Sequence, residues 1–183
     1  MHRFLGLVVV VISFSFFASC TGTTEVVKKG SSSQKEVKDY PSWFSTETVV
    51  NSGSEMVGYA SALNSDSASS VSEAVKRAKT EVKAALSDKL EEIRTEALSE
   101  YGSGYGLDSA RFLIALRKAD KAVSDVVSVS NTNARSVEGY ESYRGFAEVS
   151  VPKAKLSERI GKRLAGYEKA WNAMKESKAF ESF

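Results

Sequence analysis

Residues 71–101 read VSEAVKRAKTEVKAALSDKLEEIRTEALSEY, and the fold is predicted most directly from this segment. It contains neither Gly nor Pro, and Gly102 follows it. Its apolar residues recur at three- and four-residue steps, with charged residues between them: Val71, Ala74, Val75, Ala78, Val82, Ala85, Leu86, Leu90, Ile93 and Ala97. This period predicts a long Ala-rich helix with one face in a core. Ser70 and Glu73 have the spacing of a capping box, so the helix is expected to begin near Ser70.

The segments on either side of this helix predict strands and a second helix. Residues 55–63 alternate apolar and small side chains, which favours a first strand. Residues 108–122 predict a helix that buries Phe112, Leu113, Leu116 and Ala119. Residues 134–140, preceded by Val127 and Val129, and residues 146–151 are expected to be strands. A turn near residues 143–145 would pair these two strands as a hairpin.

The last predicted element is one helix over residues 153–178, after Pro152. Its apolar residues are spaced at steps of three and four: Leu156, Ile160, Leu164, Tyr167, Trp171 and Met174. The order strand, helix, helix, strand, strand, helix predicts an α+β fold. We expect an antiparallel sheet of about three strands, packed against the Ala-rich helix and the C-terminal helix. Residues 40–183 are long enough to form a single α+β domain.

The first residues have the pattern of an export signal. Arg3 gives a basic start, residues 4–17 carry no charge, and small residues follow. Fourteen helical residues span about 21 Å, less than the ~30 Å hydrocarbon core of a bilayer. A cleaved signal peptide over residues 1–19 is therefore favoured over a transmembrane helix, with cleavage between Ser19 and Cys20.

Cys20 is the only cysteine of the chain, and we expect it to be lipidated. Phe17-Ala18-Ser19-Cys20 resembles a bacterial lipobox, although that pattern prefers Leu where this chain has Phe17. The alternative is an ordinary signal peptide with an incidental cysteine. Residues 20–39 are polar and predict a flexible tether. The expected membrane partner is reached through the lipid on Cys20, and Thr21 in place of Asp favours the outer membrane of the cell envelope.

Composition restricts the possible chemistry. The single histidine is His2, so the expected mature chain has no imidazole for Ser-His-Asp or Cys-His catalysis and no His–Cys set for zinc. The aspartates are too dispersed for a calcium loop, and residues 102–106 favour a helix end over a phosphate loop. We therefore predict a non-enzymatic protein with no cofactor and no metal site. The near-neutral charge of +2 argues against a nucleic-acid partner.

The chain also resembles a known lipoprotein family. The resemblance lies in residues 41–43 (Pro-Ser-Trp), in residues 58–62 (Gly-Tyr-Ala-Ser-Ala), in the alanines of residues 71–101 and in residues 148–151. In these features the chain is similar to the LPP-twenty lipoprotein family, small envelope lipoproteins of Gram-negative bacteria. Some members are tied to flagellar or outer-membrane structures. The resemblance implies no catalytic residues.

Together these features predict a membrane-anchored envelope lipoprotein that serves as a structural or adaptor component. Its envelope protein partner cannot be named from the sequence. Tyr167, Trp171, Phe180 and Phe183 are the candidate partner contacts, because Phe180 and Phe183 are expected to lie exposed beyond the last helix. Packing of the Tyr167–Trp171 stripe onto the sheet is the alternative. The alternative function is a periplasmic carrier for a lipid or another hydrophobic ligand.

Overall fold

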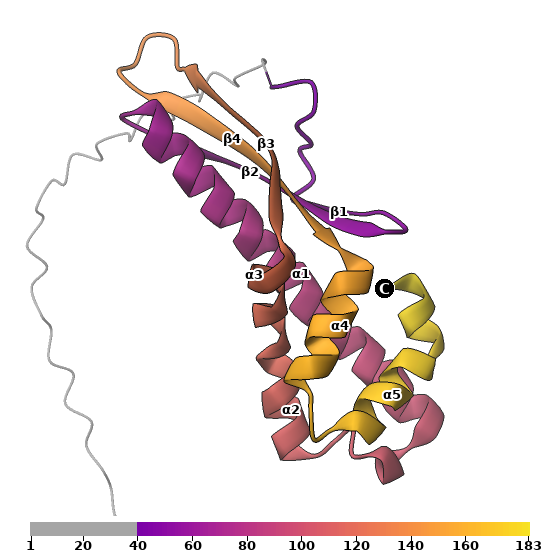
Figure 1. Cartoon of the computed structure of the whole chain (residues 1–183). Coiled ribbons are helices and arrows are strands. Elements are labelled where there is room, and N and C mark those ends of the chain that lie inside the picture. The colour runs from indigo at the N-terminus through magenta and orange to yellow at the C-terminus, as the bar shows by residue number, and fades with distance from the viewer. Residues whose placement is uncertain (1–39) are drawn as a thin grey trace, which may run out of the picture. The chain divides into compact units, whose positions relative to one another are not determined.

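A computed structural model describes residues 40–183 of the chain. The signal segment, Cys20 and the tether predicted over residues 20–39 lie outside the described residues. The elements follow in the order β1 (Val49–Asn51), β2 (Glu55–Asn64), α1 (Ser67–Tyr101), η1 (Ser103–Tyr105), α2 (Ala110–Arg117), η2 (Ala119–Ala122), α3 (Val123–Val126), β3 (Ser128–Ser136), β4 (Tyr143–Pro152), α4 (Lys153–Arg163), α5 (Glu168–Glu176) and η3 (Lys178–Ser182) (Figure 1). The predicted α+β class is confirmed.

The strands form one antiparallel sheet in the order β1-β2-β4-β3. The central pair, β2 and β4, runs in register from Glu55 opposite Pro152 to Asn64 opposite Tyr143. The predicted antiparallel sheet is present. It has one strand more than the three predicted, because the three residues of β1 pair with β2. So short a strand carries too few residues to show an alternating pattern in the sequence.

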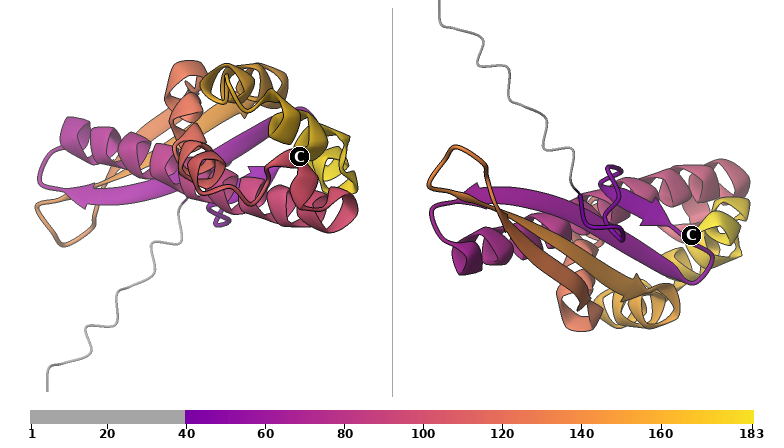
Figure 2. Two further views of the ribbon diagram at one scale, coloured as in Figure 1. Left: turned by 90° about the horizontal axis from the view of Figure 1, so that it is seen from below. Right: turned by 90° about the horizontal axis from the view of Figure 1, so that it is seen from above.

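Helix α1 supports two different layers along its length. Its N-terminal part lies on one face of the sheet, and α2, α4 and α5 gather around its C-terminal part (Figures 1 and 2). Its buried residues follow one another mostly at four-residue steps: Ser70, Ala74, Ala78, Val82, Leu86, Leu90, Ile93 and Ala97. No helix among residues 40–183 is long and apolar enough to span a membrane, since the charged face of α1 interrupts its apolar residues.

Small residues let α1 approach the sheet closely. A Cβ atom added at Gly145 of β4 would overlap the backbone of Ser70, and one added at Gly58 of β2 would lie 2.8 Å from the Ala78 carbonyl oxygen. Real Cβ atoms do not come this near to a backbone, so both positions need glycine.

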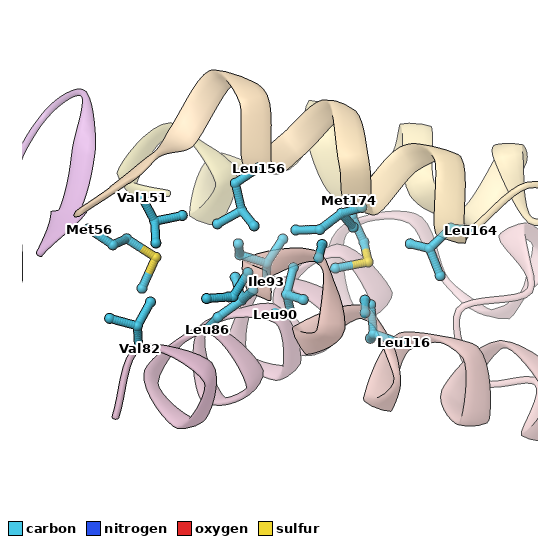
Figure 3. Close-up of a cluster of buried hydrophobic side chains, with 14 of the residues drawn as sticks. Met56, Val82, Leu86, Leu90, Ile93, Leu116, Val151, Leu156, Leu164 and Met174 are labelled. Carbon is cyan, nitrogen blue, oxygen red and sulfur yellow. The ribbon is translucent and has the colours of Figure 1, made fainter. Parts of the chain in front are cut away.

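Further along α1 the side chains become larger and the core widens. Val82 and Leu86 meet Met56 and Val151 from the sheet, and Leu90 and Ile93 meet Met174 from α5 (Figure 3). All six of the α1 and sheet residues named here are at most 1% exposed. The sheet half and the helical half of the molecule therefore share one continuous apolar core.

The opposite face of the sheet is partly covered by the segment of residues 40–44. The Phe44 ring lies edge-on to the rings of Phe146, at 5.1 Å between centroids, and of Tyr59, at 6.0 Å. Tyr40 stacks on Phe44 at 5.4 Å and meets Phe146 edge-on at 5.9 Å. As a result Phe146, whose side chain points away from α1, is fully buried.

The hairpin is confirmed as an antiparallel pair, but its predicted turn is wrong. Residues 143–145 belong to β4, and the chain turns over residues 137–142, where Gly139 has a φ of +81°. The preceding strand, β3, accordingly lies earlier than predicted, at Ser128–Ser136. β3 lies at the edge of the sheet and most of its residues are exposed, which is why its sequence shows no apolar period of two. Its pairing with β4 also shifts in register between Val129 and Asn131.

The two predicted shorter helices are each interrupted. The helix expected over residues 108–122 begins at Ala110, capped by Ser109, and becomes a 3-10 turn at η2. The single helix expected over residues 153–178 is wrong: α4 ends at Arg163 and α5 begins at Glu168. Gly166, with a φ of +93°, lies in the turn between them, and its N–H donates to the Glu168 carboxylate at 2.8 Å.

The N-cap of the long helix lies four residues before Ser70, the predicted N-cap. Asp66 is its N-cap, and the Asp66 carboxylate accepts a hydrogen bond from the Ser69 N–H at 2.7 Å. At the other end, α1 stops at Gly102 as predicted, with a φ of +72° and an N–H that donates to the Leu98 carbonyl.

Candidate functional site

Three of the predicted partner contacts pack against one another at the end of the chain. Trp171 is only 6% exposed, lies against Gly161 of α4, and meets Phe180 edge-on at 5.7 Å. Phe180 in turn stacks on Phe183 at 5.0 Å. The expected exposure of Phe180 and Phe183 is wrong, because η3 folds them back so that both are half-buried against the core. These three residues are therefore held mainly by packing, but Trp171 packs against α4 and η3 rather than onto the sheet, as the alternative interpretation proposes.

Tyr167, the fourth predicted contact, lies elsewhere. Its N–H donates to the Leu164 carbonyl at 2.9 Å, which places it in the turn between α4 and α5. One side of its ring faces Phe112 of α2 at 5.8 Å. The Tyr167 side chain also lines a surface hollow. The Trp171 N–H donates to the Tyr167 carbonyl at 3.0 Å, but the Tyr167 ring faces Phe112 whereas the Trp171 ring faces Phe180.

This hollow, which we call the basic pocket, has a volume of about 520 Å³ and is open to solvent. Its lining residues come from α2, from the turns that follow it and from the α4–α5 junction: Arg111, Ile114, Ala115, Lys118, Lys121, Arg163 and Tyr167. Four of the seven carry a positive charge, and none carries a negative charge. A volume of this size lies within the ~300–1,000 Å³ range of small-molecule sites.

The helical period explains how one helix supplies most of the pocket. Phe112 and Leu116 are buried against the core, which fixes the rotation of α2. Arg111, Ile114 and Lys118, at steps of three and four, then lie together on the outer side, and Lys121 continues the line from η2. Ile114 is 54% exposed, the highest value among the large aliphatic side chains of residues 40–183.

The positive charge of the pocket is only partly balanced by the protein. Arg163 donates to the Asp125 carboxylate at 2.8 Å, and both side chains are about one-third exposed. Within residues 40–183, Arg111, Lys118 and Lys121 form no ion pair. Cations that converge on one concave surface create a local positive potential, which attracts anions.

A second hollow has a volume of about 440 Å³ and includes Asp125, the ion-pair partner of Arg163, in its lining. It is lined by Asp125, Val126, Val127, Lys155, Glu158 and Arg159. Here acidic and basic side chains balance one another, so the hollow has no charge preference comparable to that of the basic pocket.

Lys153 is the one charged residue counted as buried among residues 40–183, at 9% exposure. Burial lowers the pKa of its ammonium group, and the positive charge of Lys89 lowers that pKa further. Its amine forms no ion pair within the described residues. No group of three or more His, Cys, Asp or Glu side chains in residues 40–183 is arranged to hold a metal ion.

No family model, curated protein or solved structure matches this chain. Sequence reasoning found Tyr167 but missed Arg111, Ile114, Lys118 and Lys121. The available signal was Ile114, an apolar residue that falls between cations and outside the buried period of Phe112 and Leu116.

Proposed function

We propose that the protein is a lipid-anchored envelope lipoprotein that acts as a non-enzymatic structural or adaptor component, in line with its resemblance to the LPP-twenty family. The observation that carries the proposal is the position of Cys20. It is the only cysteine, and it directly follows an uncharged segment and two small residues. An exported chain with one thiol is otherwise open to oxidation or intermolecular disulfides.

Localisation is the mechanism that this function implies. Lipid on Cys20 confines the domain to one leaflet, which raises its effective concentration toward partners on that surface. One acyl chain alone gives marginal binding, so stable anchoring requires more than one chain on the cysteine. We propose the outer membrane as the location, because Thr21 is not an inner-membrane retention residue.

Replacement of Cys20 tests the anchor. We expect Cys20→Ser to move from the membrane pellet to the soluble fraction after alkaline carbonate washing, and to lose incorporation of an alkyne-tagged palmitate. Ser19→Ala is the matched control, because it keeps a small residue before the cysteine and should remain anchored and labelled. Carbonate removes proteins held only by charge, so a washed pellet that retains Cys20→Ser would contradict the proposal.

The alternative, a carrier of a hydrophobic ligand, gains no specific support from the described domain. The two hollows described above are lined largely by charged side chains, whereas carriers enclose their ligand in mostly apolar walls. Native mass spectrometry of protein purified without added lipid addresses this alternative directly, since a carrier would retain a co-purified ligand.

A further inference from the structure

The basic pocket combines two kinds of contact that a single ligand class would use. Arg111, Lys118, Lys121 and Arg163 present cationic groups, and Ile114 and Tyr167 present apolar surface beside them. A guanidinium group binds phosphate oxygens through two parallel hydrogen bonds, and a lysine binds them as a point charge. A small inorganic anion has no apolar part that could contact Ile114, which is more than half exposed.

We propose that the basic pocket binds the phosphate-bearing headgroup of an anionic phospholipid, with Ile114 and Tyr167 in contact with the glycerol and upper acyl region. Surfaces that bind at the membrane interface place apolar side chains among Lys and Arg in this way. The site goes beyond the anchoring function and does not depend on lipid at Cys20, because all its residues belong to the described domain.

The geometry supports a headgroup rather than a deeply enclosed lipid. The pocket is open, and the residues from Arg111 to Lys121 extend over about 15 Å of helix axis. Arg163 closes the opposite wall, where its bond to Asp125 holds the guanidinium in place. The three unpaired cations need no internal partner to be displaced before an anion binds.

The test uses the full chain purified in neutral maltoside micelles and follows hydrogen–deuterium exchange of residues 110–122 by mass spectrometry. Doping the micelles with phosphatidylglycerol should slow exchange in this segment, whereas phosphatidylcholine should not. The protection should weaken as salt is raised, because exposed charges are screened. Lys118→Glu/Lys121→Glu should raise the phosphatidylglycerol fraction needed for half-maximal protection by at least about tenfold.

Two variants serve as controls on the charged and apolar contacts. Lys76→Glu/Lys175→Glu makes the same change in net charge at exposed sites outside the pocket and should leave the protection unchanged. Ile114→Ser should weaken protection by phosphatidylglycerol, since it removes only the apolar contact.

Three results would overturn the proposal. In the first, phosphatidylglycerol does not slow exchange. In the second, inorganic phosphate alone slows exchange as much as phosphatidylglycerol does. In the third, a polyglutamate peptide slows exchange and phosphatidylglycerol does not. The last result would assign the pocket to an acidic protein partner instead.

Discussion

The contact between Gly145 and Ser70 sets how closely α1 lies on the sheet. A methyl group at Gly145 would overlap the backbone carbonyl of Ser70, which cannot move without shifting the first turns of α1. We therefore expect Gly145→Ala to lower the free energy of unfolding by about 3 kcal/mol, the upper part of the range for overpacked sites.

Denaturant unfolding of the full chain checks this expectation. Gly53→Ala is the matched control, because nothing lies within 4 Å of a Cβ at Gly53, and its effect should stay within about 0.5 kcal/mol. Equal unfolding free energies for the two variants would show that α1 does not press on β4 at this point.

Asp66, the N-cap of α1, gives the domain a component of stability that depends on pH. Hydrogen bonds from the Ser69 side chain and the Ser69 backbone N–H hold the pKa of the Asp66 carboxyl below its ordinary value of 3.8. A lowered pKa in the folded state means that this stability is present above the ordinary value and is lost as pH falls through the folded pKa.

Asp66→Asn removes the titratable charge of the N-cap side chain but keeps its capping hydrogen bond. Asparagine caps helices as well as aspartate does but does not titrate, so it retains the hydrogen bond at every pH. We expect the melting temperature of the native chain to fall relative to that of Asp66→Asn as pH drops below about 4. The comparison extends to pH 3, about one unit below the ordinary pKa values of side-chain carboxyl groups. If the difference between the two melting temperatures stays constant from neutral pH to pH 3, this assignment is wrong.

At the scale of elements, the segment of residues 40–44 acts as a cover for the open face of the sheet. Phe44 contacts Tyr40, Trp43, Tyr59 and Phe146 through its ring. Loss of this ring would expose the otherwise buried Phe146.

Phe44→Ala should therefore lower the free energy of unfolding by about 2 kcal/mol. This is less than the loss for a Phe→Ala change at a fully buried site, because Phe44 is only half-buried. It should also speed proteolytic cleavage around residues 40–44. Tyr140→Ala, which removes a ring that is 73% exposed in the hairpin turn, serves as the control and should change neither quantity. Unchanged protease sensitivity in Phe44→Ala would show that the segment is held by other contacts.

The same scale shows what the sequence could and could not predict. The periods of α1, β2 and β4 are sufficient to predict these elements, because each buries one face over most of its length, but they do not predict the first turn of α1 or the first three residues of β4. The break between α4 and α5 was missed for a physical reason. Leu164 and Tyr167 are three residues apart, a helical step, although α4 ends at Arg163 and packs on η2 while α5 packs on α1. The useful signal was Gly166, whose positive φ ends a helix regardless of period.

The basic pocket shows a different limit. Its lining from Arg111 to Lys121 lies within one helical segment, and a helical period could have grouped those residues. Arg163 and Tyr167 come from more than forty positions later, and only the packing of α4 against η2 and of Tyr167 against Phe112 brings them there. The sequence therefore contains a pattern for the residues from Arg111 to Lys121, but none that joins them to Arg163 and Tyr167.

At the scale of the whole molecule, the long helix separates two ends of the domain. The 35 residues of α1 extend about 50 Å. The segment of residues 40–44 packs on Tyr59 and Phe146, on the face of the sheet opposite α1. The basic pocket is lined by residues of α2, η2 and the α4–α5 junction, and these elements gather around the C-terminal part of α1 (Figure 1). A chain anchored through residues that precede Tyr40 would thus present the pocket at the end remote from the point where the chain enters the domain.

This arrangement, together with the two proposals above, predicts that the lipidated chain can link two membranes. We expect full-length protein reconstituted in phosphatidylcholine vesicles to cluster added vesicles that contain phosphatidylglycerol, measured as a rise in light scattering that salt reverses. Cys20→Ser should fail because it cannot remain in the first vesicle, and Lys118→Glu/Lys121→Glu should fail because it cannot hold the second. The two failures are distinguishable, since flotation of the first vesicles recovers the lysine variant but not the cysteine variant. Clustering that persists in the lysine variant would show that the basic pocket takes no part in it, whereas clustering by Cys20→Ser would remove the lipid anchor from the mechanism.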